Sequence, residues 1–218
     1  MKKTIFIFFL SVCCLQMSGL AQKARVGFSL STGLATMRGT VNGVKEDGKY
    51  TSGYGVGILV DAPLKNSKIS FQPVLQYMQK GKLQTEMIGT YQDQVSYELR
   101  YAEVLLNFIY NTNGAAGGFF IGLGPSVSLD LPGRIVTKTE DGTKTPVNLS
   151  FGNKATDNFR GMDFGANFVL GYRLKGGFFV SANSTLGMRN LIPNESSAKG
   201  EIKNTNFGVN LGWLFNNK

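Results

Sequence analysis

The chain has 218 residues, with 28 glycines, 16 phenylalanines, no histidine and two cysteines, Cys13 and Cys14. Because both cysteines lie near the N-terminus, the rest of the chain cannot form a disulfide, a thiol nucleophile or a cysteine metal site. The formal net charge is +9, but the cations are spread between apolar stretches and are not clustered with aromatic residues, so we expect no nucleic-acid partner.

The N-terminal segment has the pattern of a secretory signal peptide. Two lysines precede an apolar run at residues 5–15, and small residues end the segment at Ala21. We expect cleavage after Ala21, which leaves a single domain over residues 22–218. A lipidated Cys13 or Cys14 is the weaker alternative, because the apolar run before it would be very short.

The first two expected strands share one pattern. In residues 26–34 and 50–60, large apolar side chains alternate with glycine and serine, and this period of two predicts strands with one large face and one small face. Gly53, Gly55 and Gly57 continue the small face of the second strand. They lack the following helix that a phosphate-binding loop requires.

The next two expected strands are irregular. The third, residues 69–80, contains Pro73, which cannot donate a hydrogen bond within a sheet, so we expect a local bulge there. The fourth, residues 95–110, moves its large residues from one face to the other near Tyr101, and we expect a second bulge at that point. This bulge would keep outward the large residues on both sides, which include Tyr97, Leu99 and Tyr101.

Residues 119–129, 162–174 and 178–188 give three further strands with the same alternation. In the last strand, residues 206–215, five large residues share one face, and asparagine and glycine fill most of the other. A large apolar face on every strand fits hydrocarbon, and a sheet in a bilayer cannot leave an open edge. We therefore predict an all-β fold, an eight-stranded antiparallel transmembrane up-and-down β-barrel in which the last strand pairs with the first.

The expected connections alternate in length. They are short at residues 62–67, 111–117 and 175–177, and long and polar at residues 35–49, 81–94, 132–161 and 189–203. Short periplasmic turns and long extracellular loops are typical of outer-membrane barrels, so we expect the chain in the outer membrane of a Gram-negative cell. A girdle of interfacial tyrosines is expected near the loop ends, from Tyr50, Tyr54, Tyr77, Tyr97 and Tyr101.

The same alternation turns a group of charged residues toward the barrel interior. We expect this group to form a charge-paired plug that fills a narrow lumen, with a gate or a binding site for a small charged solute as the alternative. No catalytic residue, metal site or cofactor is expected. The candidate residues are Lys80, Glu98, Arg100, Asp130, Asp163 and Arg189 near the loop ends of their strands, with Glu103 and Arg173 deeper.

Five segments resemble the PorT-like outer-membrane β-barrel family of Bacteroidetes. They are FQPVLQYMQKG at residues 71–81, YAEVLLNFIY at 101–110, GLGP at 122–125, LGMRNL at 186–191 and FGVNLGWLF at 207–215. Together they span nearly all of the chain after the signal peptide. The resemblance implies an outer-membrane location and an eight-stranded barrel, in a porin-like family whose members mostly lack a known activity.

These observations favour a non-enzymatic barrel, a monomer in contact with outer-membrane lipid and lipopolysaccharide. We expect a protein partner or a small solute to bind at the loops of residues 132–161 and 81–94. Three alternatives are weaker. A narrow small-solute porin conflicts with an eight-stranded interior that side chains fill, and a lipid-modifying enzyme would usually need a histidine beside its nucleophile. An accessory role in outer-membrane assembly or protein secretion is permitted only by the resemblance.

The signal-peptide prediction is tested by measuring the intact mass of protein isolated from outer membranes. We expect the mass of a chain that begins at Gln22, because the apolar run has signal length and is followed by a small-residue exit. Residues retained before Ala21, or a lipid attached to Cys13, would contradict this prediction.

Overall fold

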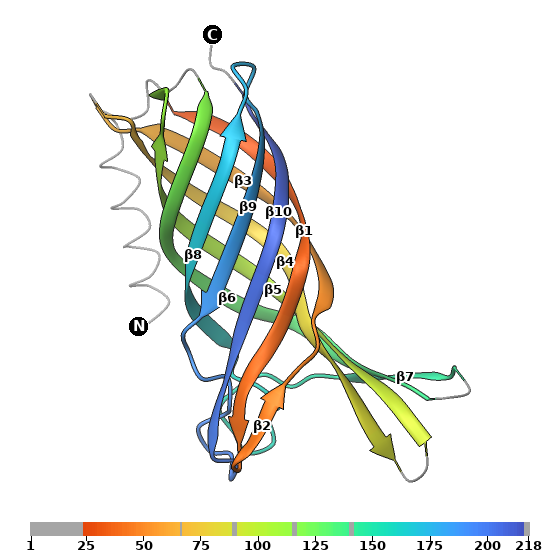
Figure 1. Ribbon diagram of the computed structural model, residues 1–218. Coiled ribbons are helices and arrows are strands. Elements are labelled where there is room, and N and C mark those ends of the chain that lie inside the picture. Colours follow the sequence, from red (N-terminus) through yellow and green to blue (C-terminus); the bar gives the residue numbers. More distant parts are fainter. Residues whose placement is uncertain (1–23, 66, 89–90, 115–116, 140–141, 216–218) are drawn as a thin grey trace.

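The computed structural model of the chain is a barrel of antiparallel strands (Figure 1). The structure describes residues 24–65, 67–88, 91–114, 117–139 and 142–215, with the backbone only at 46–47, 82–88 and 91–94. The expected signal peptide lies outside the described residues, so its cleavage stays a prediction. Within the described ranges, no helix has the length and apolar character needed to cross a membrane.

Eight strands form the wall of the barrel. They are β1 (Arg25–Val41), β3 (Thr51–Pro63), β4 (Ile69–Ile88), β5 (Tyr91–Asn111), β6 (Gly118–Lys138), β8 (Met162–Arg173), β9 (Phe178–Gly187) and β10 (Gly200–Leu214). Each strand pairs with its neighbours in this order, and β10 also pairs with β1. The expected closure of the last strand on the first is confirmed.

Two short strands extend the sheet outside this wall. β2 (Val44–Asp47) pairs with β1, and β7 (Lys144–Asn148) pairs with β6. Both lie at the end of the barrel that carries the long connections, which we call the loop end. The opposite end carries the short connections from β3 to β4, from β5 to β6 and from β8 to β9, and we call it the turn end; it is uppermost in Figure 1.

The expected loops at residues 81–94 and 132–161 are in large part hairpins. β4 and β5 continue to Ile88 and Tyr91, and β6 continues to Lys138 before the chain returns as β7. In Figure 1 both hairpins project sideways from the loop end. The surface that the sequence analysis singled out for recognition is therefore built largely on extensions of the wall strands.

Pro146 lies on the free edge of β7. The backbone N–H of Leu149 donates to the carbonyl of Gly133, and that of Thr139 to the carbonyl of Thr143, with 3.0 Å between nitrogen and oxygen in both cases. Every second residue of β7 forms backbone hydrogen bonds with β6, and the register places Pro146 between two such residues. Its missing N–H therefore falls on the outer edge, where it hinders the addition of a further strand.

Large apolar side chains cover the outer wall, as expected. In β10, Phe207, Val209, Leu211 and Trp213 are 42–54% exposed, and the residues between them are buried or half-buried. The same alternation of exposed and buried residues runs along β1, β3, β6, β8 and β9. The outward-facing runs match the roughly 9–11 residues with which a tilted strand crosses hydrocarbon.

Glycines on the inner face make room for inward aromatic rings. A Cβ atom on Gly171 would collide with the ring of Phe120, and one on Gly212 with the ring of Phe179. The two rings lie edge to face, with their centroids 6.4 Å apart. Because the lumen is narrow and also holds large side chains, the inner face of the strands must carry small residues beside them.

Paired aromatic rings gather on the outer wall at the turn end. Their centroids lie 4.9–6.3 Å apart in the pairs Phe28–Phe215, Phe71–Phe108, Phe119–Tyr172 and Phe178–Trp213. At the loop end, Tyr50 and Tyr54 are exposed and Tyr77 packs beside Tyr54, which agrees with the expected tyrosine girdle. Tyr97 and Tyr101 do not belong to that girdle, because both pack inside the barrel.

The expected change of face near Tyr101 is wrong. Along β5, Leu99 and Tyr101 are 0% and 1% exposed and share the inner side with Glu103. β5 therefore keeps one alternation from residue 95 to its end at Asn111. As a consequence, Glu98 and Arg100 lie on the outer side of the strand, and not in the lumen.

The bulge that the sequence suggested near this point lies in the partner strand. Glu98 is opposite Arg134 but Arg100 is opposite Leu131, so two residues of β6, at 132–133, face one residue of β5. The extra residue belongs to a Pro-Gly pair, whose proline lacks the N–H that regular pairing would require. The Pro-Gly pair is the sequence signal for this bulge, and it lies in β6 and not in β5.

The bulge expected at Pro73 is absent. On the β3 side, Leu59 lies opposite Val74 and Ala62 opposite Phe71, in one continuous register. On the other side Pro73 itself lies opposite a residue of β5, again without a register shift. The missing N–H interrupts pairing with β3 for two residues, and neither strand needs an additional residue to accommodate it.

The loss of stability caused by an arginine on the outer wall should depend on its depth in the bilayer. Val56 and Leu211 both neighbour Leu30 in one row at mid-height of the wall, whereas Leu34 lies at the loop end of the outward run of β1 with similar exposure. We expect Val56→Arg and Leu211→Arg to destabilise the inserted protein by about 2–4 kcal/mol and Leu34→Arg by about 0–1 kcal/mol. Reversible unfolding in lipid vesicles measures both. Equal losses at Val56 and Leu34 would contradict this placement.

Candidate functional site in the lumen

The inner side chains of β5 give the order of layers along the lumen. From the turn end to the loop end they are Asn111, Ile109, Asn107, Leu105, Glu103, Tyr101 and Leu99, all of them buried. Polar and apolar side chains thus alternate along the barrel axis. Inward side chains from the other strands lie at the same heights and complete these layers.

Two arginines close on one carboxylate at the turn end. Asp61 Oδ2 lies 2.6 Å from Arg25 Nη2 and 3.1 Å from Arg173 Nη1, and Arg173 Nη2 donates to the carbonyl of Gly114 at 2.9 Å. Asp61 lies near the end of β3, while Arg25 begins β1 and Arg173 ends β8, so the contacts join three strands across the mouth. We call Arg25, Asp61 and Arg173 the arginine layer.

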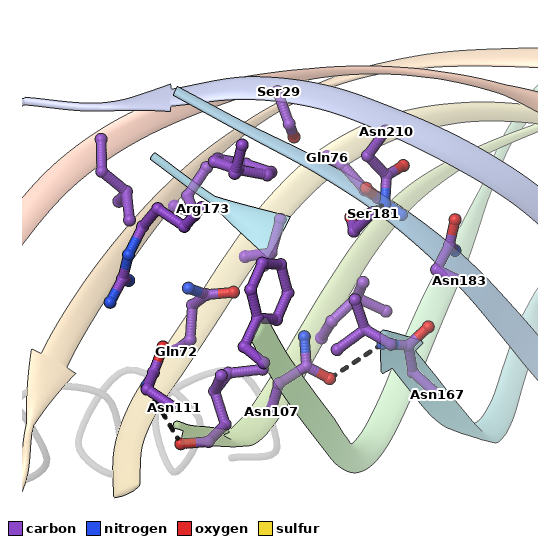
Figure 2. Close-up of a pocket in the computed structure, with 18 residues that line it drawn as sticks. Ser29, Gln72, Gln76, Asn107, Asn111, Asn167, Arg173, Ser181, Asn183 and Asn210 are labelled. Carbon is purple, nitrogen blue, oxygen red and sulfur yellow. Dashed lines mark hydrogen bonds between the residues drawn. The ribbon is translucent and has the colours of Figure 1, made fainter. Parts of the chain in front are cut away.

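The next layer combines apolar side chains with amides. Asn167 Nδ2 donates to Asn107 Oδ1 at 2.9 Å (Figure 2). Thr185 Oγ1 donates to Asn167 Oδ1 at 3.1 Å and extends this bond into a short chain across the lumen. A cavity of about 40 Å³ beside these amides has room for a few water molecules. The inner apolar cluster consists of Leu59, Val74, Leu105, Ile109, Phe120, Val169, Phe179 and Leu214.

A buried ion pair lies on the loop side of this cluster. Lys80 Nζ is 2.7 Å from Glu103 Oε1, and the two side chains are 3% and 0% exposed. Ser128 Oγ donates to the same oxygen at 2.8 Å, and Gln76 Nε2 donates to Oε2 at 2.6 Å. Lys80 also lies over the ring of Tyr101, 5.4 Å from its centroid. Both oxygens of the Glu103 carboxylate are therefore bonded.

Two further carboxylates, Asp130 and Asp163, lie close to this pair. Lys80 is within electrostatic reach of both, but its ammonium is bonded to Glu103. Asp163 is 5% exposed, and Oδ1 of Asp163 and Oδ2 of Asp130 have no hydrogen-bond partner among the described residues. We call Lys80, Glu103, Asp130 and Asp163 the acidic layer, because it holds three carboxylates and one ammonium.

An apolar cap covers the acidic layer at the loop end. Arg160, from the segment after β7, donates through its backbone N–H to Leu191 O at 2.9 Å and through Nε to Ile192 O at 2.6 Å. These bonds tie residues 149–161 to the segment after β9. The cap consists of Met37, Leu99, Tyr101, Leu149, Phe159 and Leu191, with Tyr97, Ile135, Phe151 and Ile202 packed against it.

Hydrogen bonds also order the outer surface of the cap. Ser150 Oγ donates to Asp157 Oδ1 at 2.6 Å and the backbone N–H of Lys154 donates to Oδ2 at 2.9 Å. These bonds hold the pKa of Asp157 below its usual value, because they favour the charged carboxylate. The stability that this provides is present above the usual carboxyl pKa and is lost as the pH falls through the lowered pKa.

The structure brings together four of the eight charged residues that the sequence analysis assigned to the lumen. These are Lys80, Glu103, Asp130 and Asp163, in the acidic layer. Arg173 also faces the lumen, but it lies in the arginine layer at the turn end. The plug is therefore split into two charged layers, with the inner apolar cluster between them.

The other three candidates lie outside the lumen. Glu98 pairs with Arg134 at 2.7 Å near the loop end, and Arg100 follows it on the outer side of β5. Arg189 donates to Met162 O, and its guanidinium lies 5.6 Å from the centroid of the outward ring of Phe164. The expected balance of three cations and three acids near the loop end is thus wrong.

Sequence reasoning missed two residues of the arginine layer, Arg25 and Asp61. Each stands one residue outside the end of an expected strand, at residues 26–34 and 50–60, and each continues the inner alternation of that strand. Extending both strands by one residue would have found them. Within the described part of the chain, no group of three or more histidine, cysteine, aspartate or glutamate side chains could hold a metal ion.

The sequence matches the family model described as outer membrane protein beta-barrel domain over residues 17–193. The chain belongs to this family. Membership places the protein in an outer membrane, whereas the PorT-like assignment stays an expectation. No curated protein sequence matches the chain.

Several solved structures are similar to this chain. Neisserial surface protein A is 8% identical, with 87% of this chain and 97% of that chain covered and a TM-score of 0.45. Ail, the attachment invasion locus protein of Yersinia pestis, is 11% identical, with 87% and 98% covered and a TM-score of 0.39. The toluene transporter TodX of Pseudomonas putida is 8% identical, with 88% and 90% covered and a TM-score of 0.19.

Removing the lysine of the acidic layer should strongly destabilise the barrel. Lys80→Met leaves the carboxylate of Glu103 buried without its cation, and we expect a loss of about 3–5 kcal/mol in the free energy of unfolding. The double variant Lys80→Met/Glu103→Leu should recover most of that loss, since no charge is then stranded. Reversible unfolding in lipid vesicles gives both values. A single variant as stable as the wild type would show that water solvates Glu103.

Proposed function

We propose that this protein is a non-enzymatic outer-membrane barrel with a closed lumen, which acts through the structures at its loop end. The observation that carries the proposal is the pair Lys80–Glu103, at most 3% exposed, between two apolar clusters. Burial of this ion pair indicates that side chains fill the lumen at its level. An eight-stranded barrel has little room beside such side chains. The resemblance to the PorT-like family implies the same eight-stranded outer-membrane barrel, in a family whose members mostly lack a known activity.

The layers oppose conduction in different ways. The cap and the inner apolar cluster are hydrophobic constrictions, which an ion crosses only by losing its water. The arginine layer crosses the turn-end mouth with side chains from three strands. The cavity of about 40 Å³ favours the alternative, a narrow water or solute leak; it is lined by the inner apolar cluster and by Arg173 of the arginine layer.

The projecting hairpins are the proposed interaction surface. Every residue of β7 is exposed, and the β6–β7 hairpin carries Arg134, Lys138 and Lys144 close to the membrane surface. With the turn end in the periplasm, this surface faces the outside of the cell. The cations of the β6–β7 hairpin suit lipopolysaccharide phosphates or an acidic protein segment, although the same hairpin also carries Glu140 and Asp141 in its sequence. An accessory role in outer-membrane assembly or protein secretion would use this same surface.

The closed lumen is tested in planar lipid bilayers. We expect the purified wild-type protein to show no stable conducting state, because four side-chain layers block the path. The variant Phe120→Ala/Phe179→Ala removes two rings of the inner apolar cluster and enlarges the cavity. It should remain closed, because the cap and the acidic layer are intact. A steady, ion-selective conductance from the wild-type protein would overturn the proposal and favour a porin.

A further inference from the structure

Arg100 is a cation on the outer wall without an acidic partner. It shares the outer side of β5 with Ala102, is half-buried, and lies between Gln79 of β4 and Leu131 of β6. Its Nε atom is buried and has no hydrogen-bond partner within the described residues. No carboxylate lies within ion-pair distance of Arg100 in that part of the chain.

Other arginines near the loop end differ in this respect. Arg134 pairs with Glu98 at 2.7 Å, and Arg189 donates to a backbone carbonyl at 3.1 Å and lies over an aromatic ring. Arg38 donates to the hydroxyl of Tyr50 at 3.0 Å. Among the described residues, Arg100 is the one of these four arginines without such a partner.

The height of Arg100 matches the level of lipid phosphates. The outward apolar run of β5 extends from Ala102 to Tyr110, so Arg100 stands just beyond its loop end. The paired rings of Tyr54 and Tyr77 lie beside it, and Tyr77 is within electrostatic reach of Arg100. An arginine at this boundary costs about 0–1 kcal/mol, against about 2–4 kcal/mol at the bilayer centre.

An apolar groove of about 380 Å³ runs along the outer wall next to Arg100. Val56, Tyr77 and Ala102 form one row across β3, β4 and β5, and the small methyl group of Ala102 leaves the hollow beside the tyrosine ring. Leu131, which lies opposite Arg100, closes the loop-side end. The groove is lined by Val56, Gly57, Ile58, Leu75, Gln76, Tyr77, Ala102 and Leu131.

We propose that this site binds one phosphorylated glycolipid of the outer leaflet. An acyl chain lies in the groove, its phosphate bonds to the guanidinium of Arg100, and its sugar contacts the hydroxyls of Tyr54 and Tyr77. The shape supports this occupant, because one cation stands directly above one acyl-sized hollow. This binding site goes beyond the closed lumen and the hairpin surface, and depends only on the loop end facing the outer leaflet.

Native mass spectrometry of the protein in detergent micelles, titrated with purified diphosphorylated lipid A, tests the proposal. We expect a one-to-one complex with the wild type. Arg100→Gln should weaken it about fivefold, the effect of one arginine near a lipid surface. Ala102→Leu, which fills the groove, should weaken it to a similar extent. The matched controls Arg189→Gln and Ala182→Leu, also on the outer wall, should bind as the wild type does.

Each opposite result overturns the proposal. Equal affinities for Arg100→Gln and Arg189→Gln would show that Arg100 makes no specific contact. Equal binding of lipid A and its dephosphorylated form would exclude the phosphate contact, and equal binding of phosphatidylglycerol would exclude the glycolipid. Heat-modifiable electrophoretic mobility shows that each variant is folded. All four substitutions lie outside the lumen, so they leave the test of conductance unaffected.

Discussion

The pairing of β10 with β1 is the interaction on which the rest of the structure depends. In hydrocarbon an unpaired backbone N–H or C=O costs several kilocalories per mole, so a sheet is stable there only without a free edge. The ladder between β10 and β1 removes both edges of the sheet at once. Its register also aligns Leu30 with Val56 on one side and Leu211 on the other, so the apolar band continues across the seam.

Closure with eight strands fixes the circumference, and the circumference in turn dictates what the inner face can hold. Rings such as Phe120 and Phe179 fit only where the facing strands carry glycine. The wall strands then extend beyond the ring at the loop end, where the extra residue at 132–133 sets the register between β5 and β6. Through this extension Leu99 and Tyr101 reach the cap, so the cap and the wall share one continuous strand.

Much of the fold was predictable because most strands carry unlike faces. In β10 and β8 the inner face is mostly small or polar and the outer face is mostly large and apolar, so alternation alone assigns the sides. β5 carries large residues on both faces, and its sides are decided by the register with β6. The prediction for Glu98 and Arg100 failed for this reason. Arg189 follows the last residue of β9, where strict alternation no longer applies.

The charged layers of the lumen are unbalanced in opposite directions, and this imbalance supports the proposed closed lumen. The acidic layer holds three carboxylates and one ammonium, whereas the arginine layer holds two guanidinium groups and one carboxylate. The inner apolar cluster separates them, so the excess charges cannot neutralise each other by contact. A cation is attracted to the acidic layer but repelled at the turn-end mouth, and an anion meets the reverse. An ion of either sign would therefore meet one charged layer that repels it and two apolar clusters, so the proposed closed lumen would need no moving gate.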